Sequence, residues 1–422
     1  MKVLWFTNIL LPAVRNHLGL PPYVGGAWIE ALRSNLEKYF QDISLHIVSF
    51  SNTDFEPYTH ANATYYPILQ KRPSGKLWNI LENWKHSRYS DTELQQCVDL
   101  INTCKPDLIH VHGSENLFGL VQEDTDVPVV VSLQGLIISC QHFEFPGLGI
   151  HDKLRFMFCR ASLKGLGPIH NAIEHKTQAQ IEKRVISGCK HFMGRTEWDR
   201  SIVKLMNPDA SYYHVDEILR EPFYQNTWDN SRLGDHTVFS TISSAVRKGL
   251  LVLLDSIGIL KKRGYENILL RLAGSIKGQA NWTMIKKRIT NNQIESNVEF
   301  LGPLIAEDLS IELANNSVFV HPSYIDNSPN SLAEAMMVGI PCVATAVGGV
   351  PSMLEHGKEG LLCTPGDPYS IAAAINRILS DKGLSEKLST NARKKALEYH
   401  NPKRITNNLY HIYKDIIAYV FV

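Results

Sequence analysis

The sequence lacks several features that mark particular classes of protein. No apolar run approaches the roughly 18–20 residues that a membrane-spanning helix needs, no segment repeats at a fixed interval, and no tract has low complexity. The 43 Lys and Arg residues are almost balanced by 42 Asp and Glu residues, which gives a formal net charge of +1. We therefore expect no electrostatically driven affinity for nucleic acid and no nucleic-acid partner.

Cysteine is sparse, with seven residues that form no Cys-x-x-Cys pair. An odd number in a chain of 422 residues is not typical of a small secreted disulfide scaffold. We expect reduced, mostly buried thiols in a cytoplasmic protein. The first 14 residues imitate a signal peptide, but Thr7 and Asn8 interrupt the apolar run and no small-residue cleavage site follows. A buried β-strand over 2–7 explains this stretch better.

Short apolar strands alternate with amphipathic helices along the whole chain. Strands are expected in two series, at 2–7, 43–50, 107–112, 127–133 and 189–194, and at 236–243, 267–274, 297–302, 317–323, 341–346 and 360–364. Two successive βαβ series predict an α/β protein with two doubly wound parallel sheets. Polar residues and prolines interrupt the pattern near 210–236. We place the domains at 1–215 and 216–400, with a closing helix in 401–422.

The most informative stretch is residues 321–349, HPSYIDNSPNSLAEAMMVGIPCVATAVGG. A strand ends here in a polar loop with Asp326, and a helix begins near Asn330 and Ser331. The N–H groups at such a helix start favour an anion such as phosphate, and the carboxylates of Asp326 and Glu334 suit sugar hydroxyls. Two simpler roles stay open, because Ser331 and Glu334 match a capping box and Asp326 fits a turn.

This stretch resembles the E-x7-E region of the family 4, or group 1, retaining glycosyltransferases. Asp326 and Glu334 have the required spacing, and the AM-x-x-G-x-P and VGG runs follow. Further similar motifs occur in the family's order, namely Gly25-Gly26 before a helix, KPDLIHVHG at 105–113, RKG at 247–249, NVEFLGPL at 297–304 and GLLCTPGDP at 360–368. The resemblance implies the GT-B fold, in which two Rossmann-like domains face each other across a cleft and a C-terminal helix, here 402–418, crosses back to the N-terminal domain.

The resemblance also implies roles for residues of the C-terminal domain. Glu334 would accept hydrogen bonds from the ribose hydroxyls of a nucleotide sugar, and Asp326 would contact the donor sugar. Backbone groups around Asn330 and Ser331 would meet the diphosphate. Lys248 would neutralise the departing phosphate, so that a cation and helix-start amides answer the developing charge and no metal or other cofactor is expected.

Residues of the N-terminal domain receive roles in the same way. Gly25 and Gly26 would allow the backbone to approach the phosphates and the sugar closely, because a side chain would block that approach. His112 would lie beneath the sugar ring. Gln134, which follows the strand at 127–133, would line the acceptor side.

The chain departs from the family pattern at two positions. The family usually has Glu where this sequence has Asp326, and the shorter side chain bears on donor preference. The family also often has Arg at the position of Ser243. Arg247, next to Lys248, is the candidate substitute. Without a cation that reaches the phosphate, catalytic competence is in doubt.

The expected function is that of a metal-independent retaining glycosyltransferase of the hexosyltransferase type. It would move a sugar from a nucleotide sugar to a glycan or lipid-linked acceptor in bacterial surface polysaccharide synthesis, in the cytoplasm or at the inner face of the membrane. A nucleotide-sugar epimerase and a non-catalytic nucleotide-sugar-binding partner on the same architecture stay open. An oxidoreductase is disfavoured, because no Gly-x-Gly-x-x-Gly follows either first strand.

Two segments, 71–89 and 151–176, mix basic residues with aromatic and apolar ones. Such a surface can contact anionic lipid headgroups or a lipid-linked acceptor, which would make the protein a peripheral membrane protein. The same composition is typical of a solvated amphipathic helix that packs on its own domain, and this second interpretation is favoured.

Overall fold

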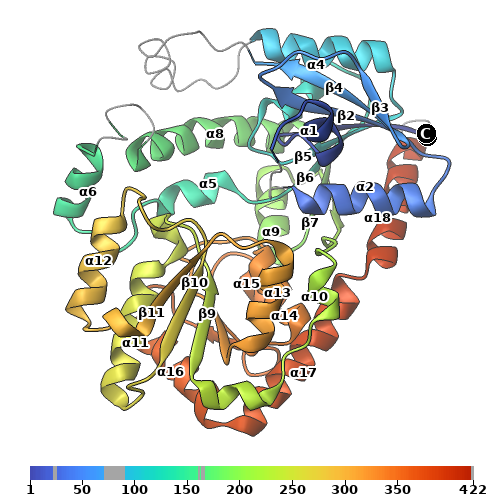
Figure 1. Cartoon of the computed structure of the whole chain (residues 1–422). Coiled ribbons are helices and arrows are strands. Elements are labelled where there is room, and N and C mark those ends of the chain that lie inside the picture. The colour runs from blue at the N-terminus through green and yellow to red at the C-terminus, as the bar shows by residue number, and fades with distance from the viewer. Residues whose placement is uncertain (22–25, 71–90, 160–161, 163–166, 420–422) are drawn as a thin grey trace. The chain divides into compact units, whose positions relative to one another are not determined.

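The computed structural model describes residues 1–21, 26–70, 91–159, 162 and 167–419. The chain forms two compact units (Figure 1). Unit 1 comprises Met1–Gln141, His170–Ile218 and Asn401–Val422, and unit 2 comprises His142–Ile169 and Leu219–His400. The segment 142–169 therefore belongs to unit 2, although the sequence suggested an N-terminal domain that ran without interruption to 215. It lies there because Leu148 and Phe156 pack against Met284.

Unit 1 is built on an eight-stranded sheet with the order β3-β4-β2-β1-β5-β6-β7-β8. All neighbouring strands are parallel except β3 and β4. The strands are β1 (Lys2–Thr7), β2 (Ser44–Ser51), β3 (Tyr58–His60), β4 (Ala63–Leu69), β5 (Leu108–His112), β6 (Val129–Ser132), β7 (His191–Gly194) and β8 (Ser211–His214). Five of them confirm the strands expected in this part of the sequence.

Strand β4 was not expected, and it contains Pro67, which cannot donate a hydrogen bond to a neighbouring strand. The structure accommodates this proline at a position with one strand neighbour. Pro67 is in register with Ser49 of β2, whereas the antiparallel partner β3 pairs only with Ala63–Tyr65. Among the described strands, none pairs with the outer side of β4 beside Pro67, so the proline removes no ladder hydrogen bond between them.

The sheet of unit 1 is covered on both faces. Alternate residues of β1 point to opposite sides, with Val3 and Trp5 in one apolar cluster and Leu4 and Phe6 in another. The described helices of the unit are α1 (Pro12–His17), α2 (Ala27–Tyr39), α4 (Asp91–Cys104), the 3-10 helix η1 (Leu117–Glu123), α5 (Ile137–Cys140), α8 (Pro168–Gly188), α9 (Glu197–Met206) and α18 (Pro402–Tyr419).

The closing helix α18 returns to unit 1, as the sequence predicted. Tyr413 of this helix is fully buried in the apolar cluster that contains Val3 and Trp5. Its hydroxyl accepts a hydrogen bond from Trp5 Nε1 at 3.1 Å and lies 2.5 Å from His110 Nδ1. One buried hydroxyl thus joins the last helix to β1 and β5.

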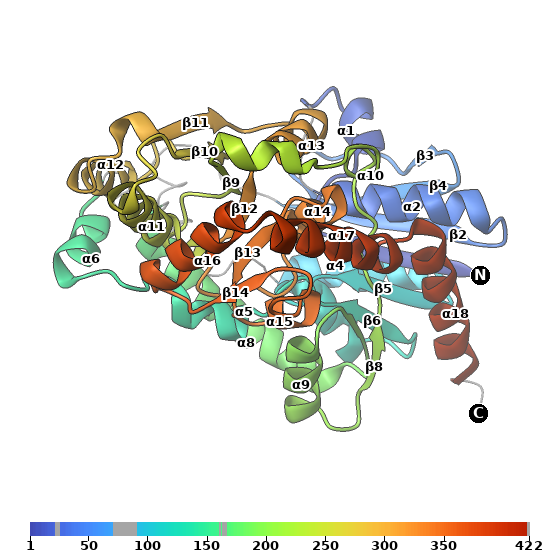
Figure 2. The same cartoon turned by 90° about the horizontal axis from the view of Figure 1, so that it is seen from below.

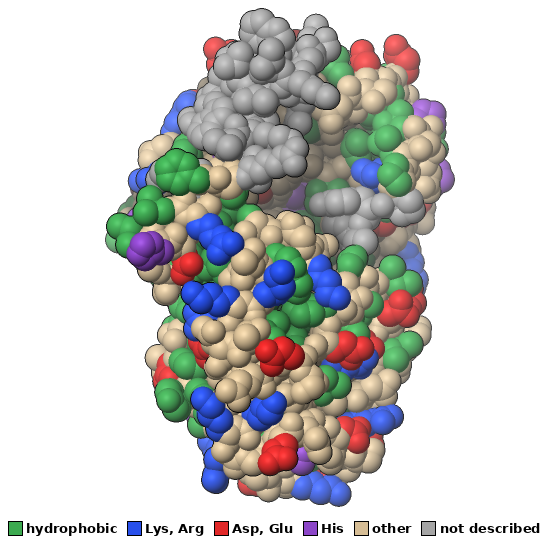
Figure 3. All heavy atoms as spheres, turned by 60° about the vertical axis from the view of Figure 1, so that its left-hand side comes forward, with side chains coloured by type: hydrophobic (Ala, Val, Ile, Leu, Met, Phe, Trp, Pro, Cys, Tyr) green, Lys and Arg blue, Asp and Glu red, His purple; other side chains and the backbone are tan. Residues whose placement is uncertain are grey.

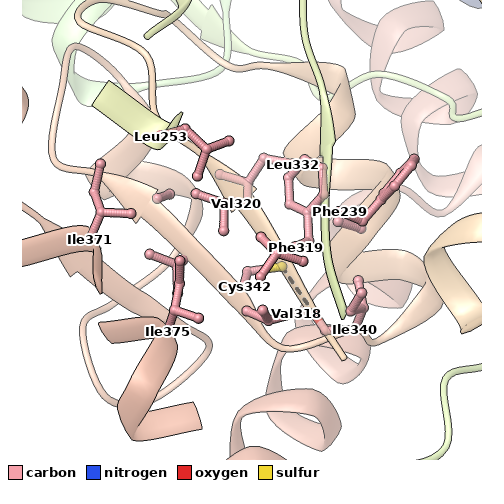
Figure 4. Packing of buried hydrophobic residues seen from close by; sticks show 14 of the residues in the cluster. Phe239, Leu253, Val318, Phe319, Val320, Leu332, Ile340, Cys342, Ile371 and Ile375 are labelled. Atoms are coloured by element: carbon pink, nitrogen blue, oxygen red, sulfur yellow. Dashed lines mark hydrogen bonds between the residues drawn. The ribbon is translucent and has the colours of Figure 1, made fainter. Parts of the chain in front are cut away.

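Unit 2 contains a six-stranded parallel sheet with the order β11-β10-β9-β12-β13-β14. The strands are β9 (Thr237–Thr241), β10 (Leu269–Ala273), β11 (Val298–Gly302), β12 (Val318–His321), β13 (Cys342–Thr345) and β14 (Leu361–Cys363). All six were expected. The central strand β12 is buried along its whole length, and Figure 4 shows its side chains Phe319 and Val320 among buried residues of other elements, such as Leu253 and Leu332.

Helices pack on this sheet in two groups. Helix α11 (Leu250–Arg263) lies beside α12 (Trp282–Asn291) and α16 (Pro368–Ser380), and α14 (Asn330–Val338) contacts α10 (Pro222–Gln225), α13 (Ala306–Asn315) and α17 (Lys382–Tyr399) (Figure 2). Right-handed crossovers in opposite directions from β9 and β12 place α11 and α14 on opposite faces. The remaining elements are η2 (Gln141–Phe143), α6 (Ile150–Met157), η3 (Asn230–Asp235), η4 (Val246–Lys248), η5 (Glu295–Asn297) and α15 (Val350–Met353).

Two further expectations concern thiols and membrane helices. All seven cysteines are free thiols, and five of them are buried. Within the described part of the chain, no helix combines the length and the apolar character needed to cross a bilayer. The basic and aromatic segment 71–89 lies outside the described residues.

We predict that Tyr413→Phe lowers the free energy of unfolding by about 1–3 kcal/mol, because it leaves buried polar groups of Trp5 and His110 without the hydroxyl. Urea unfolding followed by tryptophan fluorescence measures the change. Tyr369→Phe is the matched control, because Tyr369 is 71% exposed. Equal stabilities of the two variants would show that the hydroxyl of Tyr413 does not help to hold α18.

Candidate active site

The first candidate site lies where the strand order of unit 2 reverses. From β9 the chain proceeds outward through β10 and β11, and it then returns to β12 on the other side of β9. The loops that leave the carboxyl ends of β9 and β12 therefore diverge, and ligands of doubly wound sheets bind at such a point. Lys248 lies in η4 after β9, and Asp326 lies in the loop after β12.

Lys248 and Asp326 form an ion pair across this switch point. The two side chains are 27% and 18% exposed, and Lys248 Nζ lies 2.6 Å from Asp326 Oδ2. Ser323 Oγ donates to the same oxygen at 3.3 Å, and His321 Nε2 lies 3.2 Å from it. Burial alone would raise the pKa of Asp326, but the charge of Lys248 and the contact with His321 outweigh it and hold that pKa well below its usual range. Asp326 is therefore an anion at neutral pH.

Two glycines allow the loops around this pair to pack closely. Gly249 has φ +79°, and a Cβ there would lie 1.9 Å from the carbonyl oxygen of Pro322. Gly348 has φ +48°, and a Cβ there would lie 2.0 Å from the carbonyl oxygen of Asp326. Gly349 N also donates to Asp326 O at 3.1 Å. The loops after β9 and β13 thus rest on the backbone that carries Asp326, and a side chain at either glycine would separate them.

Helix α14 begins beside this loop. Its N-cap residue is Pro329, which has no side-chain oxygen, and Ser331 is already inside the helix. The capping box suggested by the sequence is therefore wrong. The N–H groups of Asn330 and Ser331 belong to the first turn, which has no intrahelical acceptor for them. These N–H groups are the ones that the sequence analysis expected to meet the diphosphate.

Glu334 has a partner that sequence reasoning missed. The side chain is buried, and its Oε1 accepts hydrogen bonds from Arg220 Nε at 3.0 Å and Arg220 Nη2 at 2.7 Å. Arg220 also lies over the ring of Phe223, 4.8 Å from its centroid. Arg220 stands just after the junction of the two units and 114 positions before Glu334, and no motif in the sequence connects them.

Ser243 and Arg247 lie near Lys248 without contacting Asp326. Ser243 is exposed, and its Oγ accepts a hydrogen bond from Ala245 N at 3.4 Å. Arg247 Nε lies 3.8 Å from Glu144 Oε1, a residue of the 142–169 segment. Among the described residues, Lys248 is thus the one Lys or Arg side chain that pairs with Asp326.

Two buried hydroxyls mark the same region. Thr241 Oγ1, at the end of β9, and Ser328 Oγ, just before α14, have no hydrogen-bond partner among the residues that the structure describes. Unsatisfied buried hydroxyls are uncommon in folded proteins. Their position at the switch point is suited to a polar ligand.

Unit 1 has its own switch point, between β1 and β5. His112 ends β5, is 2% exposed, and has no hydrogen-bond partner for either ring nitrogen within the described ranges. Burial lowers the pKa of His112 to about 3, so the ring is neutral at pH 7. Its neighbours are aromatic, with the rings of Trp5 and Trp28 at 4.8 and 5.3 Å. Gly26 has φ +77° and begins α2, and Gly25 lies outside the described residues.

A small pocket opens at the carboxyl ends of β5 to β8 of unit 1. Its polar lining includes His112, Ser132 and Gln134, and Trp28 contributes an aromatic ring. Two residues that the sequence did not single out, Arg195 and Glu217, also line it. Arg195 Nη1 lies 2.6 Å from Glu217 Oε2, and Arg195 Nη2 donates to Gln134 Oε1 at 3.2 Å.

The chain contains one Asp-x-Asp triplet, Asp124–Asp126, a spacing that is suited to a metal ion. It precedes β6 and so lies at the amino-terminal edge of the unit 1 sheet. His112 and the pocket lie at the carboxyl edge. The triplet is therefore not part of the pocket.

We predict that Gly249→Ala destabilises the protein much more than Gly278→Ala. Both glycines have φ +79°, so both substitutions cost roughly 1–2 kcal/mol of backbone strain. A Cβ at Gly278 has no neighbour within 4 Å, whereas a Cβ at Gly249 collides with Pro322 O. Thermal unfolding of the two variants measures the difference. Similar melting temperatures would contradict close packing of the loop after β9 on the Asp326 loop.

Part of the sequence is similar to that of known glycosyltransferases. Residues 228–395 match the family model described as glycosyl transferases group 1. The N-acetyl-alpha-D-glucosaminyl L-malate synthase of Bacillus anthracis is 31% identical over 133 residues, which are 32% of this chain and 34% of that protein. The amylovoran biosynthesis glycosyltransferase AmsK of Erwinia amylovora is 28% identical over 149 residues, 33% of this chain and 35% of AmsK. The matches thus span about a third of the length of these curated relatives.

Solved structures resemble the whole chain. Sucrose-phosphate synthase of Thermosynechococcus elongatus superimposes with a TM-score of 0.73 at 16% identity and covers 99% of both chains. HepE of Anabaena, solved in complex with UDP-glucose, has a TM-score of 0.67 at 16% identity and covers 98% of this chain and 100% of HepE. At this identity the likeness shows the fold alone. With two parallel-sheet α/β units and the returning C-terminal helix, that fold is GT-B, as the sequence predicted.

Proposed function

We propose that the chain, whose residues 228–395 form a group 1 glycosyltransferase domain, is a retaining hexosyltransferase of family 4. In this proposal it transfers a sugar from a nucleotide sugar to a glycan or lipid-linked acceptor in bacterial surface polysaccharide synthesis. The observation that carries the proposal is the ion pair of Lys248 and Asp326 at the switch point of unit 2, next to the start of α14. One cation, one anion and free helix-start amides match a ligand with a diphosphate and a sugar.

The donor binds to unit 2 in this proposal. The ion pair separates onto the ligand, so that Lys248 contacts the diphosphate and Asp326 accepts a hydrogen bond from a sugar hydroxyl. The amides of Asn330 and Ser331 bind the diphosphate. Glu334 accepts hydrogen bonds from the ribose, and Arg220 holds its carboxylate in position. A protein of the same fold supports a nucleotide sugar as the ligand, because HepE was solved in complex with UDP-glucose.

The reaction we propose is a front-face substitution. The bond between the anomeric carbon and the diphosphate oxygen breaks, and its electron pair stays on the diphosphate. The acceptor hydroxyl forms the new bond to the same face of the anomeric carbon, and its proton passes to the departing diphosphate oxygen. Lys248 and the amides at the start of α14 stabilise the negative charge, so that the step needs no metal ion. The anomeric configuration is retained.

We assign the acceptor to the pocket of unit 1. The charges of Arg195 and Glu217 are mutually compensated there, and His112 is neutral. Asp216, which also lines the pocket, is compensated by Arg404, whose Nη2 lies 2.5 Å from Asp216 Oδ2. The lining therefore offers hydrogen-bond donors and acceptors without a net charge, and Trp28 adds an aromatic surface. This combination suits the hydroxyls and the apolar ring face of a neutral sugar. In this proposal the enzyme works in the cytoplasm or at the inner face of the membrane.

Glu334→Ala is predicted to weaken binding of the matching nucleotide at least tenfold, because the ribose loses its acceptor. A panel of UDP, GDP and ADP and their sugars identifies the donor base by thermal stabilisation of the wild type, since a ligand that binds the folded state raises stability by about 2.7 kcal/mol at 100 times its Kd. The same titration on Glu334→Ala then gives the loss of affinity.

Arg220→Ala is the matched control for this variant. It removes the same ion pair but keeps the carboxylate, so it should weaken nucleotide binding less than Glu334→Ala does. Equal affinities in the two variants would mean that the pair supports the fold and that Glu334 does not contact the ribose.

Lys248→Met is predicted to lower kcat roughly 10²–10³-fold, the size of effect seen when one preorganised charge-stabilising group is removed. Lys261→Met is the control, because Lys261 Nζ donates to Gln293 O away from the site. Turnover is measured with the donor found above and an acceptor panel, and NMR of the product gives its anomeric configuration. Inversion would exclude the retaining mechanism. Nucleotide binding without transfer, or conversion of the donor sugar to an epimer, would support one of the alternative functions.

A further inference from the structure

Helix α6 exposes an apolar stripe to solvent. Ile150, Leu154 and Phe158 are 73%, 43% and 70% exposed and are spaced four residues apart, which places them on one side of the helix. Phe143, just before the helix, is 36% exposed. These four are among ten large hydrophobic residues that are exposed in the described part of the chain. Their concentration within sixteen positions is not the scattered distribution that is normal on a soluble surface.

The opposite side of the same segment is firmly anchored in unit 2. Phe156 is 1% exposed and packs with Leu148 and Met284, and Phe145 and Val246 border this cluster. Met284 belongs to α12, and Figures 1 and 2 both show α6 beside α12. The exposed stripe is thus held outward by a buried counterpart on the same helix. It is not an unpacked end of the chain.

Exposed cations lie on α6 and in the neighbouring α12 region. Lys153 and Arg155 lie on α6 and are exposed, and Lys277, Lys286 and Lys287 lie exposed on or just before α12. Arg288 of α12 pairs with Asp255, and the acidic residues of the two segments are Glu144 and Asp152. Six described cations against two anions give 6 − 2 = +4, whereas the whole chain carries +1. Figure 3 shows hydrophobic and basic side chains close together on the face of unit 2 that carries α6 and α12.

We propose that this α6 surface, formed by Phe143, Ile150, Leu154, Phe158 and the five exposed lysine and arginine residues of α6 and the α12 region, docks on an anionic lipid bilayer. Apolar tips that enter the interface and cations that meet phosphate-bearing headgroups are the two components of peripheral membrane binding. This extends the proposed function, because a lipid-linked acceptor is presented at such a surface. Its test does not depend on turnover.

A bilayer fits this surface better than a folded protein partner. Three apolar side chains on a short helix make a narrow ridge, and a ridge has a small contact area compared with the roughly 800 Å² that each side of a stable protein interface buries. A bilayer yields around such a ridge and needs no complementary groove. The lysines also extend beyond the ridge onto α12, where they can reach headgroups that are not in contact with the apolar residues.

The test is co-sedimentation of the full chain with vesicles of phosphatidylcholine alone and of phosphatidylcholine with 30% phosphatidylglycerol. We expect binding to the anionic vesicles at 0.1 M salt, at least tenfold weaker binding to the neutral ones, and a clear loss at 0.5 M salt, where the screening length is shorter. The triple variant Ile150→Ser/Leu154→Ser/Phe158→Ser should weaken binding at least tenfold, and so should Lys153→Glu/Lys286→Glu/Lys287→Glu.

The matched control is Leu205→Ser/Ile311→Ser/Leu397→Ser, which removes three residues that are 81%, 48% and 44% exposed elsewhere. It should bind vesicles as the wild type does. Circular dichroism and thermal unfolding show whether each variant is folded, and nucleotide binding tests the proposed function separately. Wild-type protein that does not sediment with anionic vesicles, or triple variants that bind no less tightly than the control, would overturn the proposal.

Discussion

The ion pair between Lys248 and Asp326 is the interaction on which the proposed chemistry of this chain depends. Its two residues come from strands that are neighbours in the sheet but are separated by two complete βα units in the sequence. They meet because β9 and β12 are neighbouring parallel strands, so that the loops that carry the two residues begin side by side at the same edge of the sheet. Holding both charges at neutral pH requires the pKa of Asp326 to stay low despite burial, and Lys248 achieves this. The pair thus places one positive and one negative charge at the switch point of unit 2, where the donor binds in the proposed function.

The close approach of backbone to backbone in unit 2 is a second constraint, and it explains why glycine occupies Gly249 and Gly348. Both residues have positive φ, and both face a carbonyl oxygen of the β12 loop at a distance that leaves no room for a Cβ. Thr345 Oγ1 also donates to Ser323 O at 2.5 Å from the end of β13. The loop that carries Asp326 is therefore fixed from both sides, and the position of its carboxylate does not depend on the ion pair alone.

Much of the fold could be predicted from the sequence, because buried parallel strands such as β12 read as continuous apolar runs. The candidate residues Asp326, Glu334 and Lys248 were named from motifs that resemble those of the family, and the structure brings Asp326 and Lys248 into contact. Their partners could not be predicted in this way. Arg220 with Glu334 and Arg195 with Glu217 are pairs that only tertiary packing creates, and neither arginine lies in a repeated or periodic pattern. The 142–169 segment was misplaced for the same reason, since its contact with Met284 is non-local.

Basic partners compensate the carboxylates of the two candidate sites, whereas several cations of the α6 surface have no ion-pair partner among the described residues. Asp326, Glu334 and Glu217 each have a basic partner within 2.7 Å, so both candidate sites contain charges that are already compensated. Such sites bind through local hydrogen bonds and discriminate by geometry. Lys153, Arg155 and Lys287 have no ion-pair partner among the described residues, and their charge acts outward over the screening length. A partner with many anionic groups and no fixed shape is the one that such an arrangement attracts, and a bilayer meets both conditions.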